Sequence, residues 1–130
     1  MLHEQLSRYL GQVEAAVSQY PTAYVERYTE EILTPERVNL RLRLRFDSGR
    51  LLEINEAVVV VENQLTFLDY RYHCQDENNQ LLFRYDSTPH FPDLSTFPHH
   101  KHLPKVVIAS EKPDITQVLQ EVSQQLPGFQ

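Results

Sequence analysis

Between residues 37 and 46 apolar and polar side chains alternate without a break. The even positions are apolar, and the odd positions are polar, namely Arg37, Asn39, Arg41, Arg43 and Arg45. A period of two predicts a β-strand with one buried face and one face that carries a row of arginines. Asp47, Ser48 and Gly49 then supply a tight turn, and residues 51–61 return as a second strand. The chain is therefore expected to be built on an antiparallel sheet.

The rest of the chain adds strands and two helices to this hairpin. Apolar residues at helical spacing predict a helix over residues 2–20, which Pro21 stops, and a second helix from Pro113 through Leu126, ended by Pro127 and Gly128. Further strands are expected from Thr22 onward and at 65–74, 81–86 and 106–109. We predict one α+β domain over residues 1–130, with an N-terminal helix, a five- to six-stranded antiparallel meander and a C-terminal helix. Both helices should cover one face of the sheet, and the other face should carry the site.

Four prolines mark the segment between Ser87 and Pro104. They stand at positions 89, 92, 98 and 104. Proline has no backbone N–H and a fixed φ, so these residues are expected to exclude both a helix and a central strand. A connection of this length is uncommon in a compact domain unless it is functional or disordered. Its aromatic residues Phe91 and Phe97 suggest that it is pinned to the body.

Charge and hydropathy limit the classes of function. The formal net charge is -6, which argues against a general nucleic-acid binder, since such proteins carry excess Lys and Arg. Residues 37–45 and 99–105 are nevertheless locally basic, so a basic groove on an acidic body is compatible with the sequence. No apolar run approaches the length of a membrane span, and the chain is expected to be cytoplasmic. Cys74 is the single cysteine, which excludes an internal disulfide.

Histidines gather between Tyr70 and His102. Five of the six lie there, at positions 73, 90, 99, 100 and 102. Metal-independent RNA cleavage needs a base, an acid and cations that stabilise the phosphorane, and this segment with its neighbours contains all of them. The candidate catalytic residues are His73, His100, His102, Glu56 and Tyr72. The candidate substrate-binding residues are Arg84, Lys101, Tyr85, His90 and His99. The arginine row is a further candidate for phosphate contacts, and no cofactor or metal is expected on this reading.

Three other interpretations use the same residues. His100 and His102 lie on one side of an extended segment and, with His90 or an acid, could hold zinc at a tetrahedral site with an open position. The charge of Lys101 between them would oppose a dication, which favours the metal-free role. Cys74 follows His73, but consecutive strand residues point to opposite faces, so a nucleophilic pair is disfavoured. The arginine row could also be a solvated charge ladder with Glu53 and Glu56.

Several motifs resemble one protein family. They are LEINE at residues 52–56, YRYH at 70–73, FRYD at 83–86 and FPHHKH at 97–102, together with SEKPDI at 110–115. The chain is identified by them as similar to the TumE family, toxins of toxin–antitoxin pairs. The resemblance implies a helix-turn-helix DNA-binding antitoxin as partner and a ribonuclease-like activity on RNA. The motif positions are Glu53, Glu56, Tyr70, Tyr72, His73, Arg84, Tyr85, Asp86, His90, His99, His100, Lys101 and His102.

Sequence and resemblance together predict a toxin that cleaves RNA by metal-independent acid–base chemistry. His100 and His102 are the main acid–base candidates, supported by His73 or Glu56, and Arg84 and Lys101 are the phosphate ligands. An alternative from another class is a non-catalytic module whose open face binds a second chain, for example in a homodimer that buries the histidines.

Overall fold

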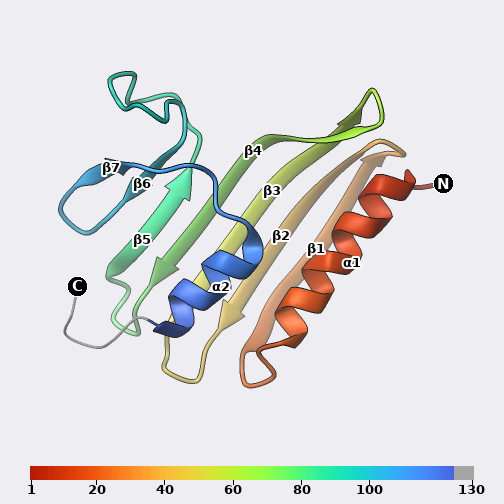
Figure 1. Cartoon of the computed structure of the whole chain (residues 1–130). Coiled ribbons are helices and arrows are strands. Elements are labelled where there is room, and N and C mark those ends of the chain that lie inside the picture. The colour runs from red at the N-terminus through yellow and green to blue at the C-terminus, as the bar shows by residue number, and fades with distance from the viewer. Residues whose placement is uncertain (125–130) are drawn as a thin grey trace.

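Seven antiparallel strands form a single sheet in the order of the chain. The computed structural model describes residues 1–124. The strands are β1 (Tyr24–Thr34), β2 (Arg37–Arg45), β3 (Leu51–Val61), β4 (Gln64–Gln75), β5 (Leu81–Asp86), β6 (His100–His102) and β7 (Val107–Ala109), and each pairs with the next. Figure 1 shows the helices α1 (Glu4–Ser18) and α2 (Ile115–Gln124) on one face of this sheet. The predicted α+β meander with a helix at each end is confirmed, whereas the predicted count of five to six strands is wrong.

The additional strand lies in the proline-rich segment that was expected to hold none. In β6, His100 pairs with Asp86 and His102 pairs with Arg84 on β5, while β7 pairs along the other edge. Pro98 and Pro104 both fall outside the three paired residues, so their missing N–H groups leave the ladder intact. The predicted exclusion of a central strand is therefore wrong for these three residues, and the short strand places two histidines beside β5.

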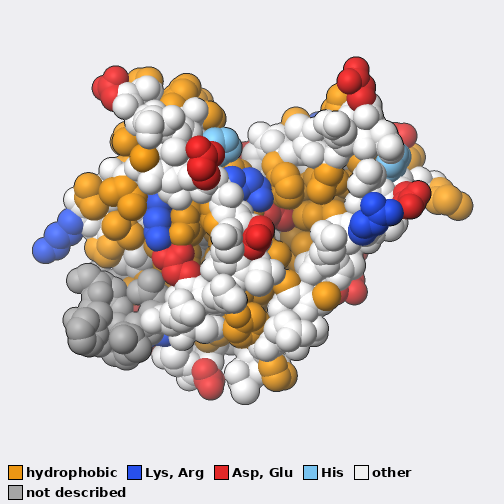
Figure 2. Space-filling view, viewed as in Figure 1, with side chains coloured by type: hydrophobic (Ala, Val, Ile, Leu, Met, Phe, Trp, Pro, Cys, Tyr) orange, Lys and Arg blue, Asp and Glu red, His pale blue; other side chains and the backbone are white. Residues whose placement is uncertain are grey.

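Apolar side chains of the sheet and of both helices form one core. The helices contribute Leu6, Tyr9, Leu10 and Val13 from α1, and Val118, Leu119 and Val122 from α2. The even positions of β2 pack against them, as the alternation of residues 37–46 predicted. We call this side of the sheet the helix face and the opposite side the open face. Figure 2 views the helix face and shows hydrophobic side chains exposed among the charged ones.

Local sequence explains where the second helix begins. Asp114 precedes α2, and its carboxylate accepts from the backbone N–H of Gln117 at 2.8 Å, while the Gln117 side chain accepts from the Asp114 N–H at 2.9 Å. This reciprocal pair satisfies two backbone N–H groups that the helix leaves free. Leu126, Pro127 and Gly128, where the second helix was expected to end, lie outside the described residues. Within residues 1–124, neither helix is long and apolar enough to cross a membrane.

Turn residues fix the register that decides which side chains share a face. Gly49 has φ +91° in the turn between β2 and β3, a conformation that glycine adopts without strain. Glu62 and Asn63 both have positive φ in the two-residue turn between β3 and β4, as tight hairpins require. The register of β3 and β4 shifts between Ala57 and Val58 and leaves Leu68 unpaired. Beyond that shift Glu56 lies opposite Tyr70, and Glu53 lies opposite His73.

Candidate functional site

The strand register brings polar and charged side chains into two rows across the open face. Because directly opposed residues of antiparallel strands point to the same face, each row can be followed through the paired positions. The first row is Arg43, Glu53, His73, Arg84 and His102. The second row is Arg41, Asn55, Arg71, Asp86 and His100. Three of the predicted site histidines and Arg84 are thereby gathered on one surface.

Asp86, His100 and His102 converge at the β5–β6 end of these rows, and we call them the Asp–His cluster. Asp86 Oδ1 lies 2.9 Å from His100 Nε2, and Asp86 Oδ2 lies 3.7 Å from His102 Nε2. The two Nε2 atoms are 3.1 Å apart. Asp86 and His100 are buried, with 6% and 1% of their surface exposed, whereas the His102 side chain is 28% exposed. The cluster is therefore reached from solvent on the side of His102.

Backbone groups orient two members of the cluster. His100 Nδ1 donates to the carbonyl oxygen of Pro98 at 3.0 Å, and the backbone N–H of Thr88 donates to Asp86 Oδ1 at 3.0 Å. Because a carbonyl oxygen only accepts, Nδ1 carries the hydrogen, so a neutral His100 ring has its lone pair on Nε2. Residues that the proline-rich segment supplies thus fix both the tautomer of His100 and the direction of the carboxylate.

An aromatic residue of the same segment covers the two imidazoles. The ring centre of Phe91 lies 4.9 Å from that of His100 and 5.8 Å from that of His102, in edge-to-face geometry. The ring centre of His90 lies 6.4 Å from that of Phe91. Burial lowers the pKa of His102, and the nearby Asp86 carboxylate partly opposes that effect. The expectation that aromatics pin the proline-rich segment to the body agrees with the position of Phe91.

His73 lies in the neighbouring row with Arg84. Arg84 Nε donates to His73 Nδ1 at 3.2 Å, and His73 Nε2 lies 2.8 Å from the Gln75 Oε1 atom. Burial lowers the pKa of His73, although the contact with Gln75 acts in the opposite direction. The neutral ring therefore accepts from the arginine through Nδ1 and donates to the amide through Nε2. This arrangement keeps the guanidinium of Arg84 on the open face, beside His102.

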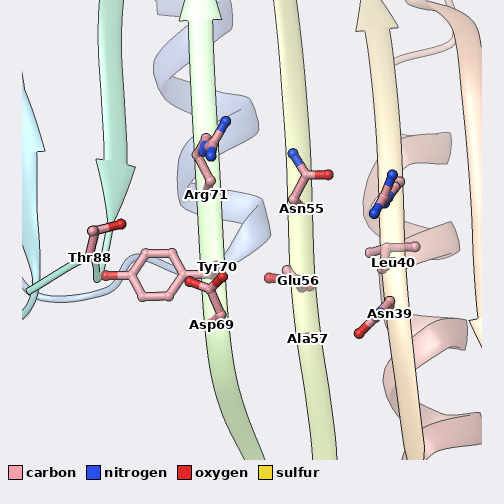
Figure 3. A pocket seen from close by; sticks show the side chains of 10 residues that line it. Asn39, Leu40, Asn55, Glu56, Ala57, Asp69, Tyr70, Arg71 and Thr88 are labelled. Atoms are coloured by element: carbon pink, nitrogen blue, oxygen red, sulfur yellow. The ribbon is translucent and has the colours of Figure 1, made fainter. Parts of the chain in front are cut away.

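A groove of about 390 Å³ runs over the same face next to the cluster. Figure 3 views the sheet with the helices behind the strands, and shows Arg71 and Asn55 beside each other on neighbouring strands. The polar residues that line the groove from the open face are Asn39, Arg41, Asn55, Asp69, Arg71 and Thr88, and Glu56 and Tyr70 also contribute to its lining. Thr88 lines the groove and also donates to Asp86. The Asp–His cluster therefore lies at one end of a groove that carries two guanidinium groups and two amides.

The arginine row of β2 divides into paired and unpaired members. Arg43 contacts Glu26 at 2.8 Å and Glu53 at 3.3 Å, and Arg45 contacts Glu26 at 3.1 Å. These two residues form a cross-strand ladder in which only Glu53 is an expected partner: Glu56 points to the helix face, and Glu26 of β1 supplies the other carboxylate. Within residues 1–124, Arg41 in the groove forms no ion pair, so its guanidinium is available to a ligand.

Glu56 and Tyr72, two predicted catalytic residues, point to the helix face instead. The buried Glu56 carboxylate accepts hydrogen bonds from the hydroxyls of Tyr72 and of Tyr9 on α1. Burial, followed by the nearby carboxylate, raises the pKa of both tyrosines. Lys112 approaches from the segment before α2, with Nζ 3.9 Å from the ring centre of Phe67, and burial lowers its pKa. The sheet therefore separates these groups from the Asp–His cluster.

Three predicted substrate-binding residues also lie on the helix side. Lys101 Nζ contacts Glu121 of α2 at 2.6 Å and lies 4.7 Å from the ring centre of Tyr85. The Tyr85 hydroxyl donates to the same glutamate at 2.5 Å. His99 Nδ1 lies 2.9 Å from the Tyr70 hydroxyl, and the two rings stack at 5.7 Å. Of the ten predicted site residues, the open face brings together His73, Arg84, His100 and His102, with His90 nearby.

Asp86 and Arg71 belong to the open face, but the sequence interpretation gave them no role. Both stand in the quoted motifs, FRYD and YRYH. In strands their parity would have placed Asp86 with Arg84, and Arg71 with His73, on the same face. The alternation of side chains along the strands could therefore have identified Asp86 and Arg71 as open-face residues, whereas the clustering of histidines could not.

A comparison with protein families agrees with the resemblance that the sequence motifs indicated. A family model described as Toxin TumE matches residues 13–126 of the 130-residue chain. No curated protein and no solved structure matches the chain.

Proposed function

Because the chain belongs to the TumE toxin family, we propose that it is the toxin of a toxin–antitoxin pair and that it cleaves RNA on its open face. The observation that carries this proposal is the position of the Asp–His cluster at the end of the arginine-lined groove. Groups able to transfer protons thereby lie next to groups able to hold a phosphodiester.

Each part of the groove has a chemical role in this proposal. Arg41 and Arg71 neutralise phosphate charge, since planar guanidinium groups bind phosphate oxygens in a bidentate manner. The amide of Asn55 offers a donor and an acceptor to base edges and to the 2′-hydroxyl that distinguishes RNA from DNA. These contacts hold a single strand along the groove so that one phosphodiester reaches the partly exposed His102.

The predicted chemistry is acid–base transfer by the histidines. His102 is the accessible member of the cluster and is the candidate base for the 2′-hydroxyl proton. Arg84 lies beside it and can stabilise the charge that develops on the phosphorane. Glu56, Tyr72 and Lys101, which the sequence placed in the same machinery, act on the helix face, so we propose a packing role for them. Catalysis without a metal stays a prediction.

Two matched variants of β2 test the groove. Arg41 and Arg37 are both exposed and point to the same face of the strand, but only Arg41 lines the groove. Loss of one charge-assisted phosphate contact costs about 1.5–3 kcal/mol, or roughly 10- to 100-fold in affinity. We expect Arg41→Gln to lower kcat/KM for RNA cleavage by that factor and Arg37→Gln to leave it nearly unchanged. Equal effects of the two substitutions would contradict the proposed position of RNA.

A toxin family implies a cognate antitoxin, and we propose a helix-turn-helix protein that binds the β1 edge of the sheet. This edge strand exposes Tyr24, Val25, Ile32 and Leu33, and exposed apolar edges favour pairing with another chain. The strand also carries acidic residues on a chain of net charge -6, which suits a basic DNA-binding partner. Co-purification of the neighbouring gene product with wild type but not with Ile32→Lys would support this partner, and a homodimer through β1 is the other outcome to measure.

A further inference from the structure

We propose that Asp86, His100 and His102 form a binding site for one divalent transition-metal ion, with Zn²⁺ as the ion that fits their donors. This inference goes beyond the proposed function: an ion on His102 Nε2 would occupy the atom proposed above as the base, so a water held by the ion would have to accept the 2′-hydroxyl proton in its place. One ligand atom from each of the three side chains lies within 4.8 Å of the other two.

The hydrogen bond of His100 to Pro98 leaves its Nε2 atom facing the two other members of the cluster. Nε2 lies 2.9 Å from Asp86 Oδ1 and 3.1 Å from His102 Nε2, and it carries the lone pair whenever the ring is neutral with its hydrogen on Nδ1. Three atoms at these distances are joined either by protons, as when His102 Nε2–H donates to His100 or when a protonated His100 donates to Asp86, or by one cation that all three bind. A metal ion in the cluster would replace these hydrogen bonds with coordinate bonds to the same atoms.

The separations agree with metal coordination. Zinc binds imidazole nitrogen and carboxylate oxygen at about 2.0–2.2 Å, so neighbouring ligand atoms of a tetrahedral site lie roughly 3.3–3.6 Å apart. The two Nε2 atoms are 3.1 Å apart, and the carboxylate lies 2.9 Å from His100 through Oδ1 and 3.7 Å from His102 through Oδ2. These separations lie on both sides of the expected range. Two imidazoles and one carboxylate leave at least one coordination position for water or for a phosphate oxygen.

The surroundings resemble those of ligating histidines in general. Such a histidine donates its second ring N–H to a carbonyl or carboxylate, which fixes the tautomer, and His100 does so with Pro98. The Asp86 carboxylate is held in turn by the backbone N–H of Thr88. Phe91 packs against the edges of both imidazoles and limits the access of water. All three features serve to hold the donors in position before an ion arrives.

The structure also removes the main objection that the sequence raised. Lys101 stands between the two histidines in the chain, but alternate strand residues point to opposite faces. Its ammonium group contacts Glu121 on the helix face and so does not point into the cluster. Arg84 lies opposite His102 in the strand register on the open face, and its Nε atom donates to His73. A bound dication would thus contact the Asp86 carboxylate directly. The Arg84 guanidinium lies on the same face and could bind the RNA phosphate that the ion binds.

Metal binding by untagged protein tests the site. Metal-stripped wild type titrated with Zn²⁺ against a chromogenic chelator should bind one equivalent, and Co²⁺ should give the intense visible bands of a low-coordinate site. His102→Ala should lower the affinity by more than about 100-fold, beyond the 10- to 100-fold typical of residues that only orient a ligand. His99→Ala, which removes the adjacent histidine outside the cluster, should keep the equivalent. His102→Cys should also keep it and add a sulfur-to-cobalt charge-transfer band.

Each outcome decides the proposal. Less than one equivalent on folded wild type, or an equal loss in His99→Ala and His102→Ala, would overturn it. Circular dichroism of each variant shows whether a loss of metal reflects a loss of fold, and His102→Cys repeats the test at the same position with a different donor. RNA cleavage by the same preparations separates the two claims. A bound equivalent without cleavage supports the metal site and refutes the proposed function, whereas cleavage without a bound equivalent does the reverse.

Discussion

Replacing Tyr9 with phenylalanine removes one of the two hydroxyls that donate to the buried Glu56 carboxylate. The ring of Tyr9 is 6% exposed and stays in place, so no large cavity forms. What is lost is one of two hydrogen bonds to a carboxylate, and a hydrogen bond to a charged group contributes about 1.5–3 kcal/mol. The carboxylate then keeps only Tyr72 as a donor. We therefore expect the free energy of unfolding to fall by about 1.5–3 kcal/mol.

The corresponding shift in Tm follows from the size of the chain. An unfolding entropy of about 2.1 cal/mol/K per residue gives roughly 270 cal/mol/K for 130 residues. The loss then lowers Tm by about 5–11 °C. Urea denaturation and thermal scans by circular dichroism measure the two quantities.

Tyr20→Phe is a matched control for this experiment. Tyr20 packs against Phe46 at 6.2 Å between ring centres and does not donate to Glu56. Its substitution should change stability by no more than about 0.5 kcal/mol. If Tyr9→Phe is no more destabilising than Tyr20→Phe, the assignment of Glu56 to a buried packing role is refuted. Coupling between Tyr9→Phe and Glu56→Gln, measured in a double-mutant cycle, should reach about 0.5–3 kcal/mol.

Three further outcomes follow from burial and from the two faces of the sheet. The pKa values of Tyr9 and Tyr72 are raised in the folded chain, so above about pH 10 the unfolded chain releases these protons and the folded chain keeps them. The free energy of unfolding should therefore be constant below pH 10 and fall above it. Tyr9→Phe should make this fall shallower in urea titrations at several pH values. Cys74 is fully buried with a pKa raised to about 12, so a thiol reagent should react only as fast as the protein opens. Lys101→Met removes the 2.6 Å contact with Glu121 and should lower stability by about 1 kcal/mol while RNA cleavage, assayed on the folded variant, stays unchanged.

The spacing of apolar residues along the chain was sufficient to predict most of the fold. The alternation of residues 37–46 predicted both the strand and its buried side, because side chains of a strand must point alternately to the core and away from it. Helical spacing predicted both helices for the same reason. The short strand β6 was missed because proline was taken to exclude pairing over a whole segment, although it excludes only its own position. Three paired residues fit between Pro98 and Pro104.

The site was predicted less completely, because residue types were counted without regard to the face on which they lie. His100 and His102 were correctly placed on one side of an extended segment, and the structure brings them to 3.1 Å. Lys101 was grouped with them although its parity directs it to the opposite face. The contact of Asp86 with the histidines depends on the pairing of β5 with β6. This contact was not predicted, because β6 was not predicted.

RNA cleavage by purified protein tests the central claim most directly when variants of the two faces are compared. Wild type, His102→Ala and Tyr9→Phe are incubated with the same structured RNA below the melting temperature of each protein. The open-face account predicts cleavage by wild type and by Tyr9→Phe, and loss of cleavage by folded His102→Ala. Cleavage that persists in His102→Ala, or that is absent from wild type, would contradict it.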